Sequence, residues 1–131
     1  MIFISHFQQL RSSTKNGNIK TDLIMVTDIE KLLRDLKRGL TEIYGDRLKA
    51  VVLFGSYARG DAHPPDSDID VMIVLKGKFD YAEEEKRSSD LIAYLCLENE
   101  VLISWVFVSD AEYIQSQMPL LLNVRKEGVT V

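Results

Sequence analysis

Cysteine is almost absent from this sequence, and so are proline and long apolar runs. The single Cys96 excludes an internal disulfide, and because Leu95 and Leu97 flank it in a helical pattern, we expect a buried structural thiol. No apolar run approaches the roughly 20 residues that a membrane-spanning helix requires. The N-terminus also lacks the basic region, apolar core and small-residue site of a secretory signal. We therefore expect a cytoplasmic protein that does not contact a membrane.

An excess of positive charge is also missing. Sixteen lysines and arginines stand against 20 aspartates and glutamates, which gives a formal net charge of −4. A general nucleic-acid binder normally has a basic face, so stable nucleic-acid binding is not expected. Nucleotides are not excluded, because Mg²⁺ can bridge acidic residues to phosphates. The length of 131 residues suffices for one hydrophobic core but not for two.

The segment from Lys49 to Leu75 is the most informative part of the sequence. It contains two short apolar runs, Ala50–Phe54 and Val71–Leu75, which are rich in Val, Ile and Leu. Gly, Pro, Asp and Ser bound both runs, and this pattern predicts two buried strands.

The residues after the first run predict an anion site. Gly55 permits a sharp turn, and a short helix over Ser56–Arg59 would direct backbone N–H groups and a hydroxyl at one point. Gly60–Ser67 is then expected to be an irregular loop, because the Pro64-Pro65 pair is incompatible with regular structure.

Two aspartates open the second apolar run. Asp68 and Asp70 are expected on the same face, because side chains alternate along a strand. Adjacent carboxylates repel each other unless a cation lies between them, and Mg²⁺ takes one or two carboxylates together with phosphate oxygens. A phosphate site beside a metal pair predicts phosphoryl or nucleotidyl transfer. The alternative is an ordinary turn followed by a solvated strand start.

Helix and strand signals elsewhere in the chain are local and clear. Capping boxes predict helix starts at Thr27, Asp80 and Ser109, and Gly45 ends the first of these helices. The polar first half of the second helix, Glu83–Asp90, is expected to face solvent or a partner. The remaining expected elements are a strand over Val101–Val108, a helix that restarts at Pro119 and ends at Gly128, and an edge strand over Val129–Val131.

The first 24 residues differ from the rest of the chain. The polar stretch Ser12–Asn18 is typical of a flexible linker, and Met25 directly precedes the Thr27 capping box. We expect residues 1–24 to form a flexible N-terminal extension, residues 25–131 to form the domain, and Met25 to be the native start. Intact-mass measurement of the natively expressed protein tests this expectation.

The central residues resemble a known family. Gly55-Ser56, Ala58-Arg59-Gly60 and Ser67-Asp68-Ile69-Asp70 together are similar to the signature of the polymerase-β-like nucleotidyltransferases. Within that superfamily the chain most resembles the minimal nucleotidyltransferase (MNT) domain of HEPN–MNT toxin–antitoxin pairs, from about Ile29 to the C-terminus. The resemblance implies an α/β (α+β) fold with a small mixed β-sheet flanked by helices.

Residue roles follow from this resemblance. It implies that Gly55 and Ser56 hold the terminal phosphates of a nucleotide, while Asp68 and Asp70 ligate Mg²⁺ and are catalytic. Two roles remain open for Arg59. It either contacts a phosphate as a charged fork or forms a structural ion pair with Asp61 or Asp66 in the loop.

One expected carboxylate is missing. Two-metal nucleotidyl transfer generally uses a third acid on the neighbouring strand, where it helps to deprotonate the attacking hydroxyl. The strand predicted over Val101–Val108 contains no acid, and Ser104 stands at the position that the third acid would occupy. Glu100, which precedes this strand, is the candidate replacement, although a solvated turn residue is the simpler interpretation.

The resemblance implies a function with two alternatives. The implied function is Mg²⁺-dependent transfer of a nucleoside monophosphate from ATP, or another nucleoside triphosphate, to a hydroxyl of a HEPN toxin. The first alternative is a catalytically weak or inactive antitoxin of the nucleotidyltransferase fold that neutralises its partner by binding, which the missing third acid favours. The second is an aminoglycoside-type nucleotidyltransferase that acts on a small molecule. We expect it less, because the chain ends soon after the predicted core, without an acceptor domain.

Overall fold

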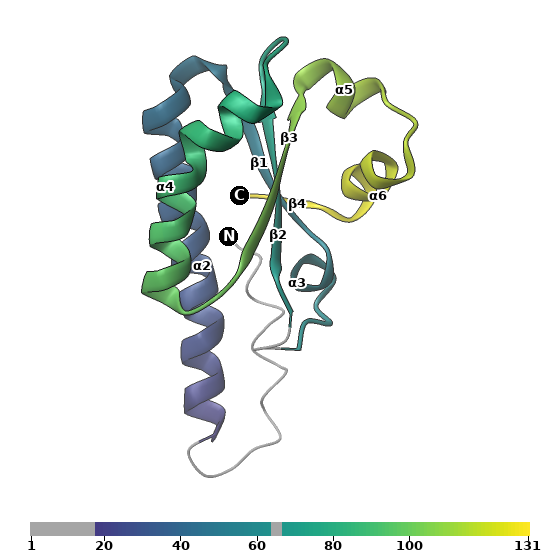
Figure 1. Ribbon diagram of the computed structural model, residues 1–131. Helices are drawn as coiled ribbons and strands as arrows, with labels where there is room; N and C mark the ends of the chain where they lie inside the picture. Colours follow the sequence, from purple (N-terminus) through teal and green to yellow (C-terminus); the bar gives the residue numbers. More distant parts are fainter. Residues whose placement is uncertain (1–17, 64–66) are drawn as a thin grey trace.

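A four-stranded mixed sheet forms the centre of the molecule (Figure 1). The computed structural model describes the backbone of residues 18–63 and 67–131, and the side chains from residue 29 onward within these ranges. The strands are β1 (Leu48–Phe54), β2 (Ile69–Leu75), β3 (Ile103–Ser109) and β4 (Val129–Thr130), in the order β3-β2-β1-β4. β1 runs antiparallel to β2 and β4, whereas β3 runs parallel to β2. The predicted strands and the mixed sheet are confirmed.

Helices cover both faces of this sheet. α2 (Asn18–Tyr44) and α4 (Tyr81–Asn99) pack on one face, while α5 (Asp110–Gln115) and α6 (Pro119–Glu127) lie on the other (Figure 1). The short helix α3 (Ser56–Arg59) follows the end of β1, and the 3₁₀ turn η2 (Gly45–Arg47) joins α2 to β1.

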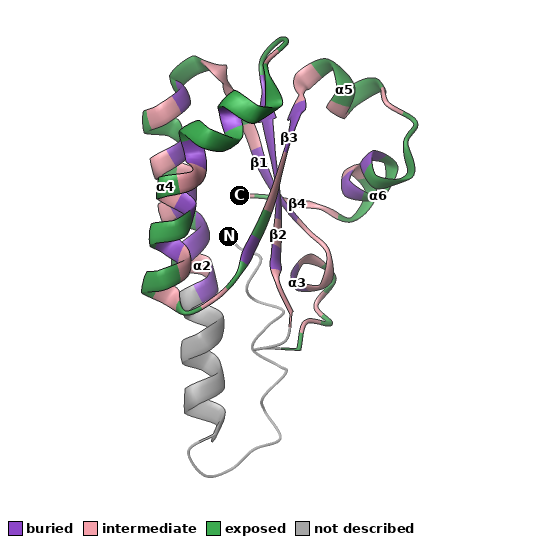
Figure 2. Ribbon diagram, viewed as in Figure 1, coloured by how far each residue is buried: buried purple, intermediate pink, exposed green. Residues whose placement is uncertain are grey.

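The alternation of side chains along the strands divides the buried residues into two clusters. Val51, Leu53, Val71 and Ile73 pack with buried leucines of α2, whereas Val52, Met72 and Val74 face α6. Figure 2 shows the buried residues concentrated between the sheet and the α2–α4 layer. The leucines of α2 in this cluster, all at most 1% exposed, are Leu32, Leu33, Leu36 and Leu40.

The predicted start of the first helix is wrong. α2 begins at Asn18 and continues through Thr27, so the backbone is helical on both sides of the capping-box sequence. The helix ends as predicted, since Gly45 has a φ of 56° and stops it after Tyr44. Residues 1–17 lie outside the described residues, so the proposed flexible extension and the Met25 start remain predictions.

The other helix signals are confirmed. Asp80 is the N-cap of α4 and accepts a hydrogen bond from the backbone N–H of Ala82 at 3.1 Å. Ser109 and Glu112 form a reciprocal capping box at α5, and Pro119 is in the first turn of α6. Cys96, expected to be buried, is half-buried at the edge of the core.

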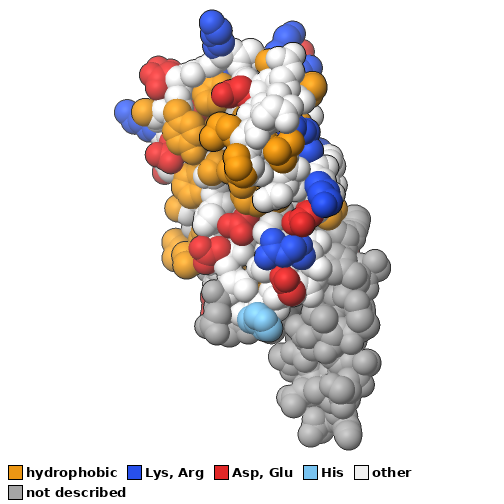
Figure 3. All heavy atoms as spheres, turned by 90° about the vertical axis from the view of Figure 1, so that its right-hand side faces the viewer, with side chains coloured by type: hydrophobic (Ala, Val, Ile, Leu, Met, Phe, Trp, Pro, Cys, Tyr) orange, Lys and Arg blue, Asp and Glu red, His pale blue; other side chains and the backbone are white. Residues whose placement is uncertain are grey.

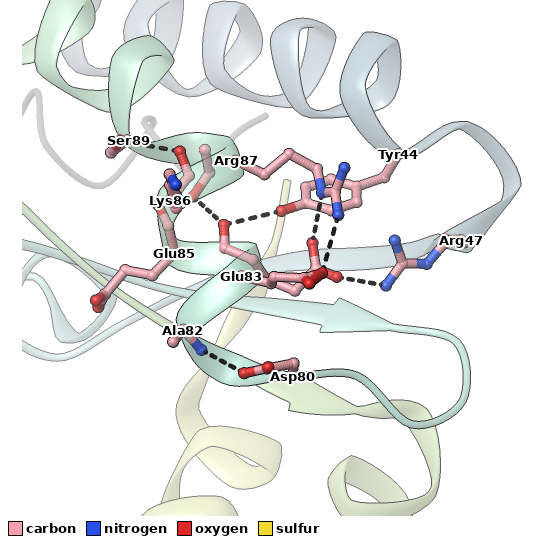
Figure 4. A network of polar contacts seen from close by, with 11 residues as sticks. Tyr44, Arg47, Asp80, Ala82, Glu83, Glu85, Lys86, Arg87 and Ser89 are labelled. Atoms are coloured by element: carbon pink, nitrogen blue, oxygen red, sulfur yellow. Dashed lines mark hydrogen bonds and ion pairs between the residues drawn. The ribbon is translucent and has the colours of Figure 1, made fainter.

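The polar first half of α4 does not face solvent entirely, which corrects the prediction. Glu84 is only 3% exposed, and its carboxylate lies between Arg47 Nη2 at 2.9 Å and Arg87 Nε at 3.0 Å. Figure 4 shows Arg47, Arg87 and Tyr44 in this network of polar contacts. Burial alone would raise the pKa of Glu84, but the hydrogen bonds from Arg47, Arg87 and Tyr44 and the charge of Arg47 together lower that pKa. The Tyr44 hydroxyl donates to the backbone oxygen of Glu84, and burial raises the pKa of Tyr44 to about 12. This network fastens α4 to the end of α2.

Candidate active site

Three strand ends meet at the candidate site. Asp70 near the start of β2 is opposite Phe54 at the end of β1 and opposite Ser104 near the start of β3. Along β2, Asp70 belongs to the same alternating set as Met72 and Val74, which face α6. The site therefore opens on the side of the sheet that carries α5 and α6.

Gly55 fits against the carboxylate of Asp70. Its backbone has φ 76° and ψ −155°, a conformation that residues with a side chain rarely adopt. A Cβ added there would overlap Oδ2 of Asp70 and lie 3.1 Å from its Cγ. Only glycine at this position lets the turn approach the acid so closely.

The turn after Gly55 is held by its own backbone. The N–H groups of Ala58 and Arg59 donate to the carbonyl of Gly55 at 3.1 and 3.0 Å. Gly60, with φ 85°, closes this single helical turn. Ser56 is the first residue of the turn and is half-buried, so the predicted helix over Ser56–Arg59 is confirmed.

Asp68 and Asp70 concentrate negative charge at this point. Burial and the neighbouring charge of Asp68 raise the pKa of Asp70, and the positive charge of Arg59 offsets part of that rise. Burial and the charge of Asp68 also raise the pKa of Tyr57 on α3. Ser104 Oγ donates a hydrogen bond to Asp68 Oδ2 at 3.1 Å. Partly buried carboxylates with this charge excess suit a divalent cation.

Magnesium fits this donor set. The side chains described, residues 29–63 and 67–131, include no group of three or more His, Cys, Asp or Glu residues that could hold a metal ion. A cation here would use Asp68 and Asp70 and would complete its ligands with water and phosphate oxygens, which is the usual arrangement for Mg²⁺. Glu100 is the exposed left-handed C-cap of α4 and belongs to no such three-ligand group. The residue beside the acid pair on β3 is Ser104.

Arg59 forms ion pairs in the structure. Its Nε lies 3.4 Å from Oδ2 of Asp61, which agrees with the structural alternative, and its Nη1 lies 3.9 Å from Oε1 of Glu127. Asp66, the other predicted partner, lies outside the described residues. Sequence reasoning missed Glu127, because only the pairing of β4 with β1 brings the end of α6 to this site.

Much of the chain matches a known protein family. Residues 29–113 match the family model of the nucleotidyltransferase domain. The chain belongs to this nucleotidyltransferase family. Two relatives from Methanocaldococcus jannaschii are named as candidate protein adenylyltransferases. One is 34% identical over 77 residues, which cover 59% of this chain and 76% of the relative. The other is 38% identical over 81 residues, which cover 62% and 74%.

Solved structures share the fold of this nucleotidyltransferase. A candidate nucleotidyltransferase from Sulfolobus solfataricus superposes with a TM-score of 0.54 at 20% identity, over 91% of this chain and 89% of that one. A toxin–antitoxin structure with AMP-PNP superposes with a TM-score of 0.51 at 23% identity, over 79% and 69%. The predicted minimal nucleotidyltransferase with an α/β polymerase-β-like fold is confirmed. Within the part of the chain that the structure describes, no helix combines the length and hydropathy of a membrane span.

Proposed function

We propose that this nucleotidyltransferase binds ATP with Mg²⁺ at the Gly55 turn and transfers AMP to a hydroxyl group of a partner protein. The hydroxyl oxygen bonds to the α-phosphorus of ATP as the bond to the β-phosphate breaks, so that pyrophosphate is released and the hydroxyl proton passes to solvent. The observation that carries the proposal is the packing of Gly55 against Asp70, whose pKa is raised by burial and by the neighbouring charge of Asp68. This contact joins a glycine turn suited to phosphates with carboxylates suited to a divalent cation.

Each residue of the site has a role in this proposal. Asp68 and Asp70 hold Mg²⁺, which when bound neutralises phosphate charge and makes the attacking hydroxyl more acidic. Gly55 and Ser56 hold the terminal phosphates through backbone N–H groups and the serine hydroxyl. Arg59, whose side chain is 46% exposed beside the acids, contacts a phosphate once nucleotide is bound.

The choice of ATP and of a protein acceptor is supported by the comparisons. The two archaeal relatives are named as candidate protein adenylyltransferases, and the toxin–antitoxin structure contains the ATP analogue AMP-PNP. We propose that the acceptor is the toxin of a toxin–antitoxin pair, of the HEPN type that the sequence signature implies. The reaction would take place in the cytoplasm, where nucleoside triphosphates are abundant.

A second candidate function follows from Ser104. A hydroxyl, and not a carboxylate, faces Asp68 from β3. Without a third acid, no carboxylate on β3 acts as a general base for the attacking hydroxyl. General-base catalysis typically raises the rate by a factor of about 10²–10⁴. A protein that binds nucleotide but neutralises its partner by contact alone is consistent with this site.

Mass analysis separates the two candidates. The protein and the product of its neighbouring gene are incubated with ATP and Mg²⁺, and both chains are weighed. A gain of one AMP on the partner, lost with the Asp68→Asn/Asp70→Asn variant, supports transfer. A stable complex without a mass gain supports neutralisation by binding and contradicts the catalytic proposal.

A further inference from the structure

A group of charged side chains lies beside the acid pair and comes from separate elements. Arg59 is the last residue of α3, Asp61 follows in the loop, and Glu127 is the last residue of α6. The Arg59 guanidinium lies between both carboxylates, with N–O distances of 3.4 Å to Asp61 and 3.9 Å to Glu127. Figure 3 shows this face of the molecule, where basic and acidic side chains alternate below a hydrophobic patch.

The ion pairs of Arg59 with Asp61 and Glu127 are weak enough to break when a ligand binds. Both distances exceed the 2.7–2.9 Å of a strong charge-assisted hydrogen bond, and the side chains of Arg59 and Glu127 are 46% and 42% exposed. Exposed ion pairs contribute little net free energy. Asp61 and Glu127 therefore bind the Arg59 side chain only weakly.

The same arginine also interacts with Asp70, because its positive charge offsets part of the rise in the pKa of that carboxyl. Before nucleotide binds, Arg59 thus forms ion pairs with Asp61 and Glu127, and its charge also acts on the carboxylate of Asp70. A phosphate group can accept two parallel hydrogen bonds from the planar guanidinium of arginine. This bidentate interaction is stronger than a single long contact between the guanidinium and a carboxylate. A triphosphate that binds Arg59 therefore has to replace the ion pairs of this arginine with Asp61 and Glu127.

We propose that Glu127 and Asp61 compete with nucleotide phosphates for Arg59, which makes Glu127 a positioning residue that lowers nucleotide affinity. This inference rests on the proposed function, because it assumes that ATP phosphates bind beside Gly55. It assigns a role at the nucleotide site to α6, which is distant from the signature residues in sequence. Removal of the Glu127 carboxylate then frees Arg59 for the phosphates.

Nucleotide titrations test this competition. The dissociation constant of Mg²⁺·AMP-PNP is measured by calorimetry for the full chain, for Glu127→Gln and for Asp61→Asn. Each variant is expected to bind roughly 1.5- to fivefold more tightly than the wild type, because exposed ion pairs of this kind are worth about 0.2–1 kcal/mol. Glu42→Gln makes the same charge change at an exposed position on α2, across the sheet, and should leave the affinity unchanged. Equal circular-dichroism spectra and melting temperatures show that the variants fold alike.

A cycle with Arg59→Ala distinguishes competition from a general charge effect. In the Arg59→Ala background, which binds nucleotide more weakly, Glu127→Gln is expected to give no further gain. Retention of the full gain there, or an unchanged affinity for Glu127→Gln alone, would overturn the inference while leaving the nucleotide site in place. If the wild type binds no Mg²⁺·AMP-PNP at all, the proposed function fails, and this inference fails with it.

Discussion

Ser104 Oγ on β3 donates a hydrogen bond to Asp68 Oδ2 across a distance of 3.1 Å. The parallel register places Ser104 opposite Asp70 as well, so this hydroxyl is the side chain of β3 that borders the acid pair. Substitution of Ser104 by an acidic residue therefore tests whether a third carboxylate is the only group that the site lacks.

The variant Ser104→Asp is expected to increase Mg²⁺-dependent nucleotidyl transfer. A third carboxylate at this position can bind the metal and accept the proton of the attacking hydroxyl, so an increase of at least about tenfold in rate is expected. The rate is measured as AMP incorporation into the partner. Without Mg²⁺ the same variant should be less stable than the wild type, because three carboxylates then repel one another.

Ser104→Asn is the matched control for that variant. It has nearly the same size as aspartate but no charge, so it should not raise the rate. An equal increase with asparagine would contradict the role of the added carboxylate.

Substitution of Gly55 by alanine is expected to disrupt the site and destabilise the fold. The new Cβ would overlap Oδ2 of Asp70, and the backbone at φ 76° disfavours any side chain. We expect a loss of about 1–3 kcal/mol in the free energy of unfolding, measured by urea denaturation, and a loss of nucleotide binding. Gly77→Ala separates the two causes, because Gly77 has a similar φ of 74° but nothing within 4 Å of an added Cβ. If both variants lost the same stability and both kept nucleotide binding, the contact with Asp70 would be unimportant.

The metal-free protein should lose stability as the pH rises through the range where Asp70 ionises. The folded-state pKa of Asp70 lies above its ordinary value of 3.8, because burial and Asp68 disfavour its charge. Between these values the folded state binds more protons than the unfolded state, so the free energy of unfolding falls with rising pH. Asp70→Asn should lack this contribution and exceed the wild type in stability near neutral pH. Denaturation curves collected from about pH 4 upward check this, and parallel pH profiles of the two proteins would contradict it.

The Glu84 network should be more important for stability than exposed charges are. Arg47→Met leaves the buried carboxylate of Glu84 with Arg87 alone, so we expect a loss of about 1–3 kcal/mol in the free energy of unfolding. Arg34→Met, an exposed position on α2, is the control and should change stability by less than about 0.5 kcal/mol. The two values come from chemical denaturation, and equal losses would mean that the network contributes nothing specific.

The parts of this structure that sequence predicts are those set by neighbouring residues. The Gly55 turn and the short helix after it depend on local backbone rules, and they are found where the sequence places them. Asp70 lies in β2 as predicted, whereas Asp68 directly precedes the first residue of that strand, Ile69. Contacts between distant segments have no such signal. Glu84 looked solvated because most of its neighbours on α4 are, and Glu127 approaches Arg59 only because the sheet brings α6 beside α3.

The start of α2 shows the opposite failure, in which a local signal is overridden. Thr27 and Glu30 have the capping-box spacing, yet the helix continues through them from Asn18. A capping box stabilises a helix end only where the preceding residues leave the helix, and sequence alone does not determine that. The expected third acid is a different case. The family resemblance indicates the position of Ser104, but its hydrogen bond to Asp68 is seen only in the structure.

The decisive experiment for the site is a calorimetric titration of ATP into the protein with and without Mg²⁺. We expect Mg²⁺-dependent binding to the wild type and none to the Asp68→Asn/Asp70→Asn variant, which should remain folded because both substitutions preserve shape and remove repulsion. Unchanged ATP affinity in that folded double variant would contradict the assignment of Asp68 and Asp70 as the metal-binding pair of this nucleotidyltransferase.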